Sequence, residues 1–226
     1  MNVLLVVAKA PVAGQAKTRL CPPLTPGQAA GIAAAALLDT VAAVRATPAT
    51  IPVLAATGRF ADAERASELT AALAGWHLLP QRGGTFGDRL ANAYADTAHA
   101  FPGRPVLQIG MDTPQLNPDL LDSALDLLTG YDAVLGPAVD GGWWALGLRD
   151  PGHATALREV RMSTGDTGRH TRAALRRRGL CPAPLPVLRD VDDWPAALAV
   201  ADEVPDGRFA LAVRASAAAL LAGGQR

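Results

Sequence analysis

The chain has 226 residues and no net charge, because 21 lysines and arginines balance 21 acidic residues. Half of the residues are apolar and 19% are charged, a composition that excludes a disordered chain and supplies a large core. The charge balance leaves no broad basic face, so we expect a small-molecule ligand and neither a nucleic-acid nor a membrane partner. The length is about 1.5 times that of a typical domain, which a single α/β domain can reach. We therefore predict one domain over residues 1–226.

Short apolar runs alternate with longer helical ones, which is typical of βαβ units around a mostly parallel sheet. The predicted strands are residues 3–8, 51–56, 76–79, 106–109, 133–135, 143–148 and a proline-rich segment near 184–188. The predicted helices are residues 27–45, 60–73, 86–100 and 118–128, one that ends at 176–178, and two that begin near 194 and 209. The sequence therefore predicts an α/β fold.

Targeting and redox signals are weak. Cys21 and Cys181 form no metal-binding spacing and require no disulfide. The apolar run at residues 3–7 is too short for a signal peptide, and no uninterrupted apolar stretch reaches about 18 residues. We expect a cytoplasmic protein, and a homodimer is left open.

The loop after the first predicted strand holds both lysines of the chain. In doubly wound sheets, ligands bind outside the carboxyl ends of the strands. The loop is neither a Walker A motif nor a GxGxxG fingerprint, but its cationic and flexible character suits phosphate oxygens. The residues that give it this character are Lys9, Gly14, Lys17, Thr18 and Arg19. We predict phosphate binding here; the alternative is a solvated surface loop.

Carboxylates follow two other predicted strands. Asp112 comes directly after the fourth strand, where it would suit a Mg²⁺ or Mn²⁺ ion or would instead form a turn before Pro114. Asp190 and Asp192 lie on the same side of an extended segment, so both can face one ion. Asp193 should point away and cap the helix that follows it. The predicted metal ligands are therefore Asp112, Asp190 and Asp192.

A glycine pair separates another aspartate from two tryptophans. Asp140 precedes Gly141 and Gly142, where the backbone can approach a ligand closely, and it is a candidate proton acceptor or a simple turn residue. Adjacent strand residues face opposite sides of a sheet. We therefore expect one of Trp143 and Trp144 to pack in the core, and the other could present an aromatic face to a sugar.

Taken in order, six segments resemble the bacterial DUF2064 family, within the GT-A or nucleotide-diphospho-sugar transferase superfamily. The matching segments are residues 17–20, 81 with 86–89, 110–114, 135–142, 163–164 and 190–192. The Lys-Thr-Arg-Leu stretch at 17–20 and the paired aspartates also resemble phospholactate guanylyltransferases. The chain departs from the family at residues 161–162, at the tryptophan pair and at Asp193, so the resemblance says least about contacts to an acceptor.

The resemblance implies a GT-A-like three-layer α/β/α sandwich for the single nucleotide-diphospho-sugar transferase-like domain. It implies catalytic roles for Asp112, Lys17 and Asp140. The implied nucleotide-binding residues are Ala8, Lys9, Pro11, Gly14, Lys17, Thr18, Arg19, Gln81, Arg89 and Gly110. The implied acceptor-binding residues are Gly141, Gly142, Trp143, Ser163 and Thr164. For Arg89, the alternative is an ion pair with Asp88 or Asp96.

The expected function is that of a metal-dependent, nucleotide-utilising transferase, chiefly a glycosyltransferase that moves a sugar from a sugar nucleotide to a small acceptor. The alternative is a guanylyltransferase-like enzyme that joins a nucleoside triphosphate to a phosphorylated acceptor and releases pyrophosphate. Asp-Thr-Pro at 112–114, in place of Asp-x-Asp, favours this alternative, whereas the lack of a Gly-x-Gly-x-Arg loop and the tryptophan pair favour glycosyl transfer. A non-catalytic nucleotide-binding protein would have no need of metal ligands.

Overall fold

The computed structural model describes residues 1–223. Within them, seven strands form one sheet in the order β3-β2-β1-β4-β6-β5-β7. The strands are β1 (Asn2–Lys9), β2 (Thr50–Thr57), β3 (His77–Pro80), β4 (Val106–Gly110), β5 (Ala133–Pro137), β6 (Trp143–Leu148) and β7 (Ala183–Pro184). All pairings are parallel except those of β6, which runs antiparallel to β4 and β5. The predicted mostly parallel α/β fold is confirmed.

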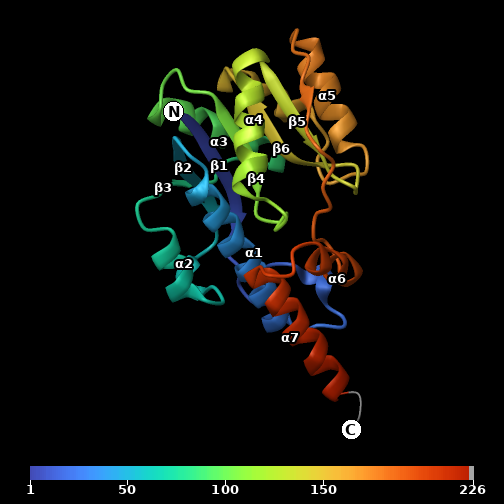
Figure 1. The fold of residues 1–226 in the computed structure, drawn as a ribbon. Helices are drawn as coiled ribbons and strands as arrows, with labels where there is room; N and C mark the ends of the chain where they lie inside the picture. Colours follow the sequence, from blue (N-terminus) through green and yellow to red (C-terminus); the bar gives the residue numbers. More distant parts are fainter. Residues whose placement is uncertain (224–226) are drawn as a thin grey trace.

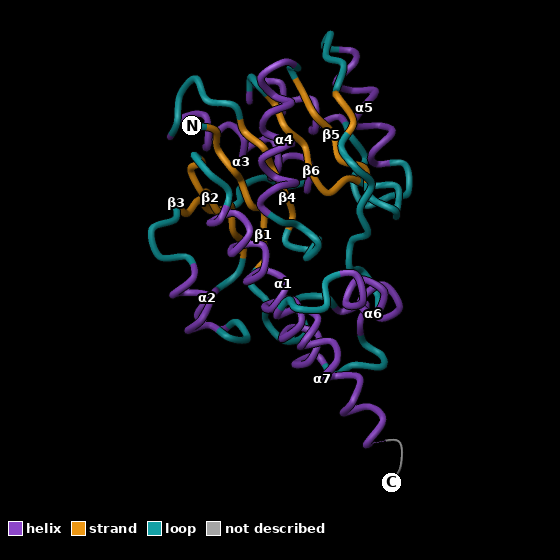
Figure 2. Tube along the Cα trace, in the orientation of Figure 1, coloured by secondary structure: helices purple, strands orange, loops and turns teal. Residues whose placement is uncertain are grey.

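Helices cover both faces of the sheet, giving the three layers visible in Figures 1 and 2. The α-helices are α1 (Pro26–Ala46), α2 (Ala66–Ala72), α3 (Phe86–Ala100), α4 (Pro118–Gly130), α5 (Thr167–Arg177), α6 (Trp194–Glu203) and α7 (Arg208–Gly223). Three 3₁₀ segments, η1 (Thr18–Leu20), η2 (Phe60–Asp62) and η3 (Pro151–Glu159), also occur in the described chain. α1 and α4 cover one face, and α3, η3 and α5 cover the other.

The alternation of side chains along β1 creates the two core layers. Leu4 and Val6 pack with residues of α1 and α4, whereas Leu5 and Val7 pack with residues of α3. This follows from the two-residue period of a strand, which sends successive side chains to opposite faces. A run of buried apolar residues in the sequence thus becomes a central strand shared by two cores.

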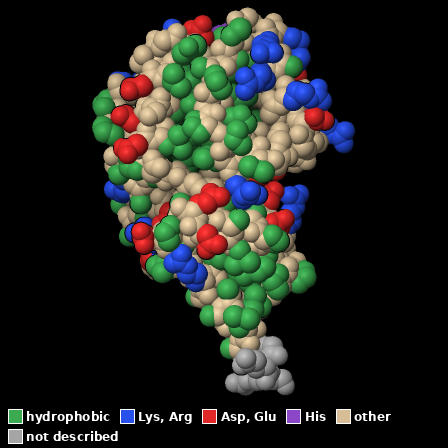
Figure 3. All heavy atoms as spheres, turned by 45° about the vertical axis from the view of Figure 1, so that its right-hand side comes forward, with side chains coloured by type: hydrophobic (Ala, Val, Ile, Leu, Met, Phe, Trp, Pro, Cys, Tyr) green, Lys and Arg blue, Asp and Glu red, His purple; other side chains and the backbone are tan. Residues whose placement is uncertain are grey.

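A third apolar cluster joins α6 and α7 to the first half of α1, away from the sheet. Phe209 of α7 and Val200 of α6 pack there against Ile32 of α1. α7 then projects from the body of the protein (Figure 1). Figure 3 shows apolar side chains on the outer surface of this end, and Leu198 and Leu211 are exposed by 41% and 60%.

α1 is long and apolar enough to cross a membrane by length and composition. However, 72% of its apolar window is buried inside the protein. The sheet lies along one side of α1, and α7 packs along another. Burial on more than one side accounts for a helix that is rich in alanine nearly all round.

Three elements differ from the sequence prediction. The helix expected at 60–73 is split, because Glu64 donates its backbone N–H to the carbonyl of Pro11 at 2.9 Å and the helix resumes only at Ala66. η3 was not predicted. The strand expected near 184–188 shortens to β7 because prolines remove ladder donors, although Leu188 still forms one bridge with Ala138.

Candidate functional site

Two pockets adjoin at the carboxyl ends of β1 and β4. The larger pocket encloses about 510 Å³, and the smaller pocket encloses about 350 Å³. Five residues line both and form their common wall: Val7, Arg19, Phe86, Asp112 and Asp192. Pockets of this size at the carboxyl edge of a sheet are the usual ligand sites of α/β folds.

The smaller pocket gathers most of the predicted nucleotide-binding residues. Those that line it are Ala8, Lys9, Lys17, Thr18, Arg19, Gln81 and Arg89. Pro11 and Gly14 are not among its lining residues, and Gly110 lines the larger pocket instead. Gln81 is already engaged, because its Nε2 donates to the carbonyls of Ala8 and Ala55 at 2.9 and 3.0 Å. It therefore fixes the strand ends that form this pocket.

Lys17 forms the centre of the ionic contacts. Its Nζ lies 2.9 Å from Asp112 Oδ1 and 3.4 Å from Asp192 Oδ1, and it also donates to the carbonyl of Val191. Burial alone would lower the Lys17 pKa, but the two carboxylates outweigh burial and raise it above its usual value. Lys17 thus stays protonated and ties the first loop to the segment after β7.

Arg89 remains a candidate for ligand binding. The acidic residues that could have paired with it are taken, since Asp88 pairs with Arg158 at 3.0 Å and Asp96 with Arg82 at 2.6 Å. Among residues 1–223, the buried Nε of Arg89 has no hydrogen-bond partner. Its guanidinium carbon lies 5.5 Å from the ring centre of Phe86. The expected ion pair with Asp88 or Asp96 is therefore absent from the described chain.

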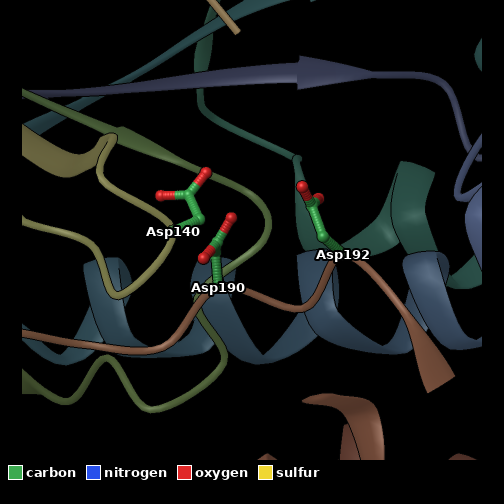
Figure 4. Close-up of side chains that lie close together, drawn as sticks. All are labelled: Asp140, Asp190 and Asp192. Carbon is green, nitrogen blue, oxygen red and sulfur yellow. The ribbon is translucent and has the colours of Figure 1, made fainter. Parts of the chain in front are cut away.

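Three carboxylates gather on the side of the larger pocket. Asp140, Asp190 and Asp192 each place an oxygen within 4.8 Å of the others (Figure 4). Asp140 comes from the turn between β5 and β6, and the other two come from the segment that follows β7. The sequence analysis expected Asp112 in this set; in the structure Asp112 pairs with Lys17. Asp193 points away and caps α6 as predicted, accepting from the Ala196 N–H at 2.8 Å.

Crowding makes Asp190 hard to ionise. Burial, followed by the negative charges of Asp140 and Asp192, raises the pKa of Asp190 from 3.8 to about 6. The folded protein therefore binds more protons than the unfolded chain between these two pH values, and the ionised carboxyl destabilises the fold as pH rises through this window.

We expect Asp190→Asn to raise the free energy of unfolding at pH 7.5 by about 1 kcal/mol, after discounting the shift for the side chain's partial exposure. The gain should shrink as the pH falls and vanish near pH 3, below the unfolded value of 3.8, where the carboxyl is protonated in both states. Urea unfolding in EDTA at both pH values measures this difference. A gain that is equal at the two pH values would contradict the titration of Asp190.

Two glycine-rich turns interlock to form one wall of the larger pocket. A Cβ on Gly141 would lie 1.9 Å from the Gly165 carbonyl oxygen, and Gly168 donates its backbone N–H to the Gly141 carbonyl at 2.8 Å. Gly141 itself does not line the pocket, whereas Gly142, Ser163 and Thr164 do. Gly141 is thus required by packing between the turns.

The two tryptophans lie on opposite faces of the sheet, as the strand period predicts, although both are among the residues that line the larger pocket. Trp144 is 3% exposed and packs against Gly136, and its indole N–H donates to the Pro186 carbonyl at 2.9 Å. Trp143 lines the larger pocket, and its indole N–H is held by Thr171 Oγ1 at 3.1 Å. Trp143 therefore presents its aromatic surface, not its polar edge, to the pocket.

Several residues that line the larger pocket were not predicted from the sequence, and two of them bear on its chemistry. Phe86 lies in the wall common to both pockets, and Gln108 lines the larger one. The signal for Gln108 was available, because it is a polar residue inside the apolar run of a predicted strand. Phe86 belongs to the segment 86–89 that resembles the family, but only Arg89 of that segment was taken as a site residue.

Solved structures of other proteins are similar to this fold. A protein of Desulfovibrio desulfuricans G20, provisionally assigned as a nucleotide-diphospho-sugar transferase, has 23% identity and a TM-score of 0.85, with 97% of each chain covered. CMP:2-keto-3-deoxy-manno-octonic acid synthetase in complex with CTP has 11% identity and a TM-score of 0.54, covering 94% of this chain and 99% of its own. These likenesses establish the fold.

No curated protein matches the sequence. The profile of one family matches residues 40–164, which is more than half of the chain. The family is described as uncharacterized protein conserved in bacteria (DUF2064), and the residues that suggested it lie around both pockets. The chain therefore belongs to the DUF2064 family.

Proposed function

We propose that the protein is a metal-dependent transferase that uses a nucleotide, and specifically a glycosyltransferase that moves a sugar from a sugar nucleotide to a small acceptor. The observation that carries this proposal is the pair of adjoining pockets with a charged common wall. A cationic pocket suits the phosphates of a nucleotide, and the neighbouring pocket leaves room for a second group. The similarity in fold to nucleotide-diphospho-sugar transferases agrees with it.

The carboxylate cluster fits a hard divalent cation. Its three side chains offer only oxygen donors, which Mg²⁺ and Mn²⁺ prefer, and a cation would relieve the repulsion that raises the Asp190 pKa. In this proposal Asp190 and Asp192 hold the ion, with Asp140 as third ligand in place of Asp112. When bound, such an ion neutralises negative charge on phosphate oxygens.

The remaining residues bind and orient the nucleotide. Arg19 lies in the common wall with its guanidinium 3.0 Å from Asp192, so it can face phosphates while its position is held. Arg89 forms no ion pair within residues 1–223 and brings its positive charge to the smaller pocket. Asp140 has one oxygen held by the Gly142 N–H at 2.7 Å, which leaves its other oxygen to serve as ligand or as proton acceptor, but not both.

Nucleotidyl transfer is the second candidate. The observation that favours it is that Asp112 at the end of β4 has no second aspartate two residues away, as Asp-x-Asp would supply, and that it pairs with Lys17 at 2.9 Å. In that reaction the α-phosphorus of a nucleoside triphosphate is attacked and pyrophosphate leaves.

We also propose that residues 1–226 form a single domain and that the protein is cytoplasmic.

The test incubates the protein with Mg²⁺ or Mn²⁺, a panel of nucleoside triphosphates and sugar nucleotides, and small hydroxylated or phosphorylated acceptors. We expect sugar nucleotides to raise Tm only with metal, and a nucleoside diphosphate to be released. Release of pyrophosphate from a triphosphate would assign the second candidate. Binding of every nucleotide with equal strength in EDTA would overturn the metal-dependent mechanism.

A further inference from the structure

Gln108 is a buried polar residue in the middle of β4. It is 2% exposed on β4, in register with Leu5 of β1 and Leu146 of β6. Within residues 1–223 its Oε1 has no hydrogen-bond partner. A buried polar atom without a partner destabilises a protein, and an apolar side chain of similar size would avoid that cost. The fold alone therefore does not explain a glutamine here.

The larger pocket reaches this side chain. Gln108 and Gly110 are two residues apart on β4 and so lie on the same face of the sheet, and both line the pocket. A Cβ on Gly110 would meet no atom closer than 3.8 Å, which leaves space above the strand end. Asp112 follows two residues later. A ligand held near the carboxylates can therefore extend over Gly110 to the Gln108 carboxamide.

Apolar side chains form much of the wall around Gln108 on this face of the sheet, and Ser163, Thr164 and Thr167 line the pocket farther along. Val7 and Leu90 line the pocket and belong to the same core cluster as the neighbouring strands. Trp143 packs against that cluster with its indole N–H already bonded to Thr171. Phe86 adds a second aromatic ring. A ligand that fits must therefore combine C–H surfaces for these walls with a polar group for Gln108.

We propose that Gln108 binds a hydroxyl group of a hydroxylated carbon skeleton in the larger pocket and thereby determines specificity. A carboxamide both donates and accepts hydrogen bonds. A hydroxyl group can donate to its oxygen or accept from its N–H. The inference rests on the proposed function, in which this skeleton is either the sugar of the donor or a hydroxylated acceptor. It adds the residue that distinguishes hydroxylated from deoxygenated ligands.

The experiment compares wild type with Gln108→Met, which keeps the length of the side chain and removes its polar atoms. One arm measures binding of UDP, GDP, UDP-glucose and GDP-mannose by calorimetry with Mn²⁺. The other arm measures binding of glucose, mannose and glycerol, with and without the nucleoside diphosphates. The first arm detects binding of a donor sugar, and the second detects binding of an acceptor. The samples without nucleotide test the role of Gln108 even if no nucleotide binds.

We expect wild type either to bind a sugar nucleotide more tightly than its nucleoside diphosphate in the first arm or to bind glucose, mannose or glycerol in the second. Gln108→Met should lose at least about 10-fold of the affinity that the sugar or polyol contributes. Nucleoside diphosphate affinity should not change, and Tm should stay equal or rise. Gln115→Met is the control for removing a buried carboxamide outside both pockets. Unlike Gln108, Gln115 donates through Nε2 to the Arg189 carbonyl at 2.8 Å and to Glu203 at 3.1 Å, so this variant should lower Tm. It should leave every ligand affinity unchanged.

Two results would overturn the inference. One is a lowered Tm in Gln108→Met with ligand affinities unchanged, which would make Gln108 structural. The other is that neither arm reveals binding that depends on Gln108. Failure of the proposed function is distinguishable, because it would appear as loss of nucleotide binding or of its metal dependence in the wild-type protein.

Discussion

Asp192→Asn is expected to lower metal-dependent turnover by at least about 100-fold, because metal stabilisation of phosphate charge contributes several kcal/mol to such reactions. Asp192 belongs to the carboxylate cluster, lines both pockets and lies 3.0 Å from Arg19. Asparagine keeps the size of the side chain but removes the charge that a divalent cation requires. Steady-state kinetics and direct titration with Mn²⁺ measure the two consequences.

Asp193 provides the matched control for this substitution. It is the next residue, but its carboxylate caps α6 by accepting from the Ala196 N–H. Asparagine caps helices as well as aspartate does, so Asp193→Asn should preserve stability, turnover and Mn²⁺ affinity. Equal losses in the two variants, or full activity in Asp192→Asn, would show that the cluster holds no catalytic metal.

The sequence predicted the elements of this site better than their pairings. The alternation rule places Asp190 and Asp192 on one side of their segment, and the structure brings both to the same cluster. Their third partner, Asp140, lies some fifty residues away along the chain and is separated from them by β6, η3, α5 and β7. No local period encodes that contact, since it depends on how β5 and β7 pair in the sheet.

For the lysines, too, the sequence shows where the residues lie along the chain but not which residues they contact. The clustering of both lysines in one loop is visible in the sequence, but the contact between Lys17 and Asp112 is not. The contact depends on the positive φ of Lys17, 50°, which a lysine adopts only when its surroundings compensate the strain. Likewise, the split of the helix expected at 60–73 comes from a backbone hydrogen bond to Pro11, more than fifty residues earlier.

Lys17→Met is expected to weaken nucleoside di- and triphosphate binding by about 10-fold, because it removes a positive charge from the lining of the smaller pocket even though the three ammonium donors already contact Asp112, Asp192 and Val191. Binding of the free nucleoside should not change. Isothermal titration with the matched nucleoside, diphosphate and triphosphate measures both. Equal losses for all three ligands would mean that Lys17 only maintains the loop structure.

The same substitution should lower Tm by about 2–6 °C in EDTA, because it leaves Asp112 and Asp192 without their ammonium partner. Those carboxylates are 43% and 42% exposed, so water limits the loss. Lys9→Met is the control, since Lys9 also lines the smaller pocket but forms no ion pair within residues 1–223, and its Tm should match wild type. Mg²⁺ should raise the Tm of Lys17→Met more than that of wild type, because a cation can replace the lost charge between the carboxylates. Equal increases in both proteins would mean that Lys17 and the metal act at separate places.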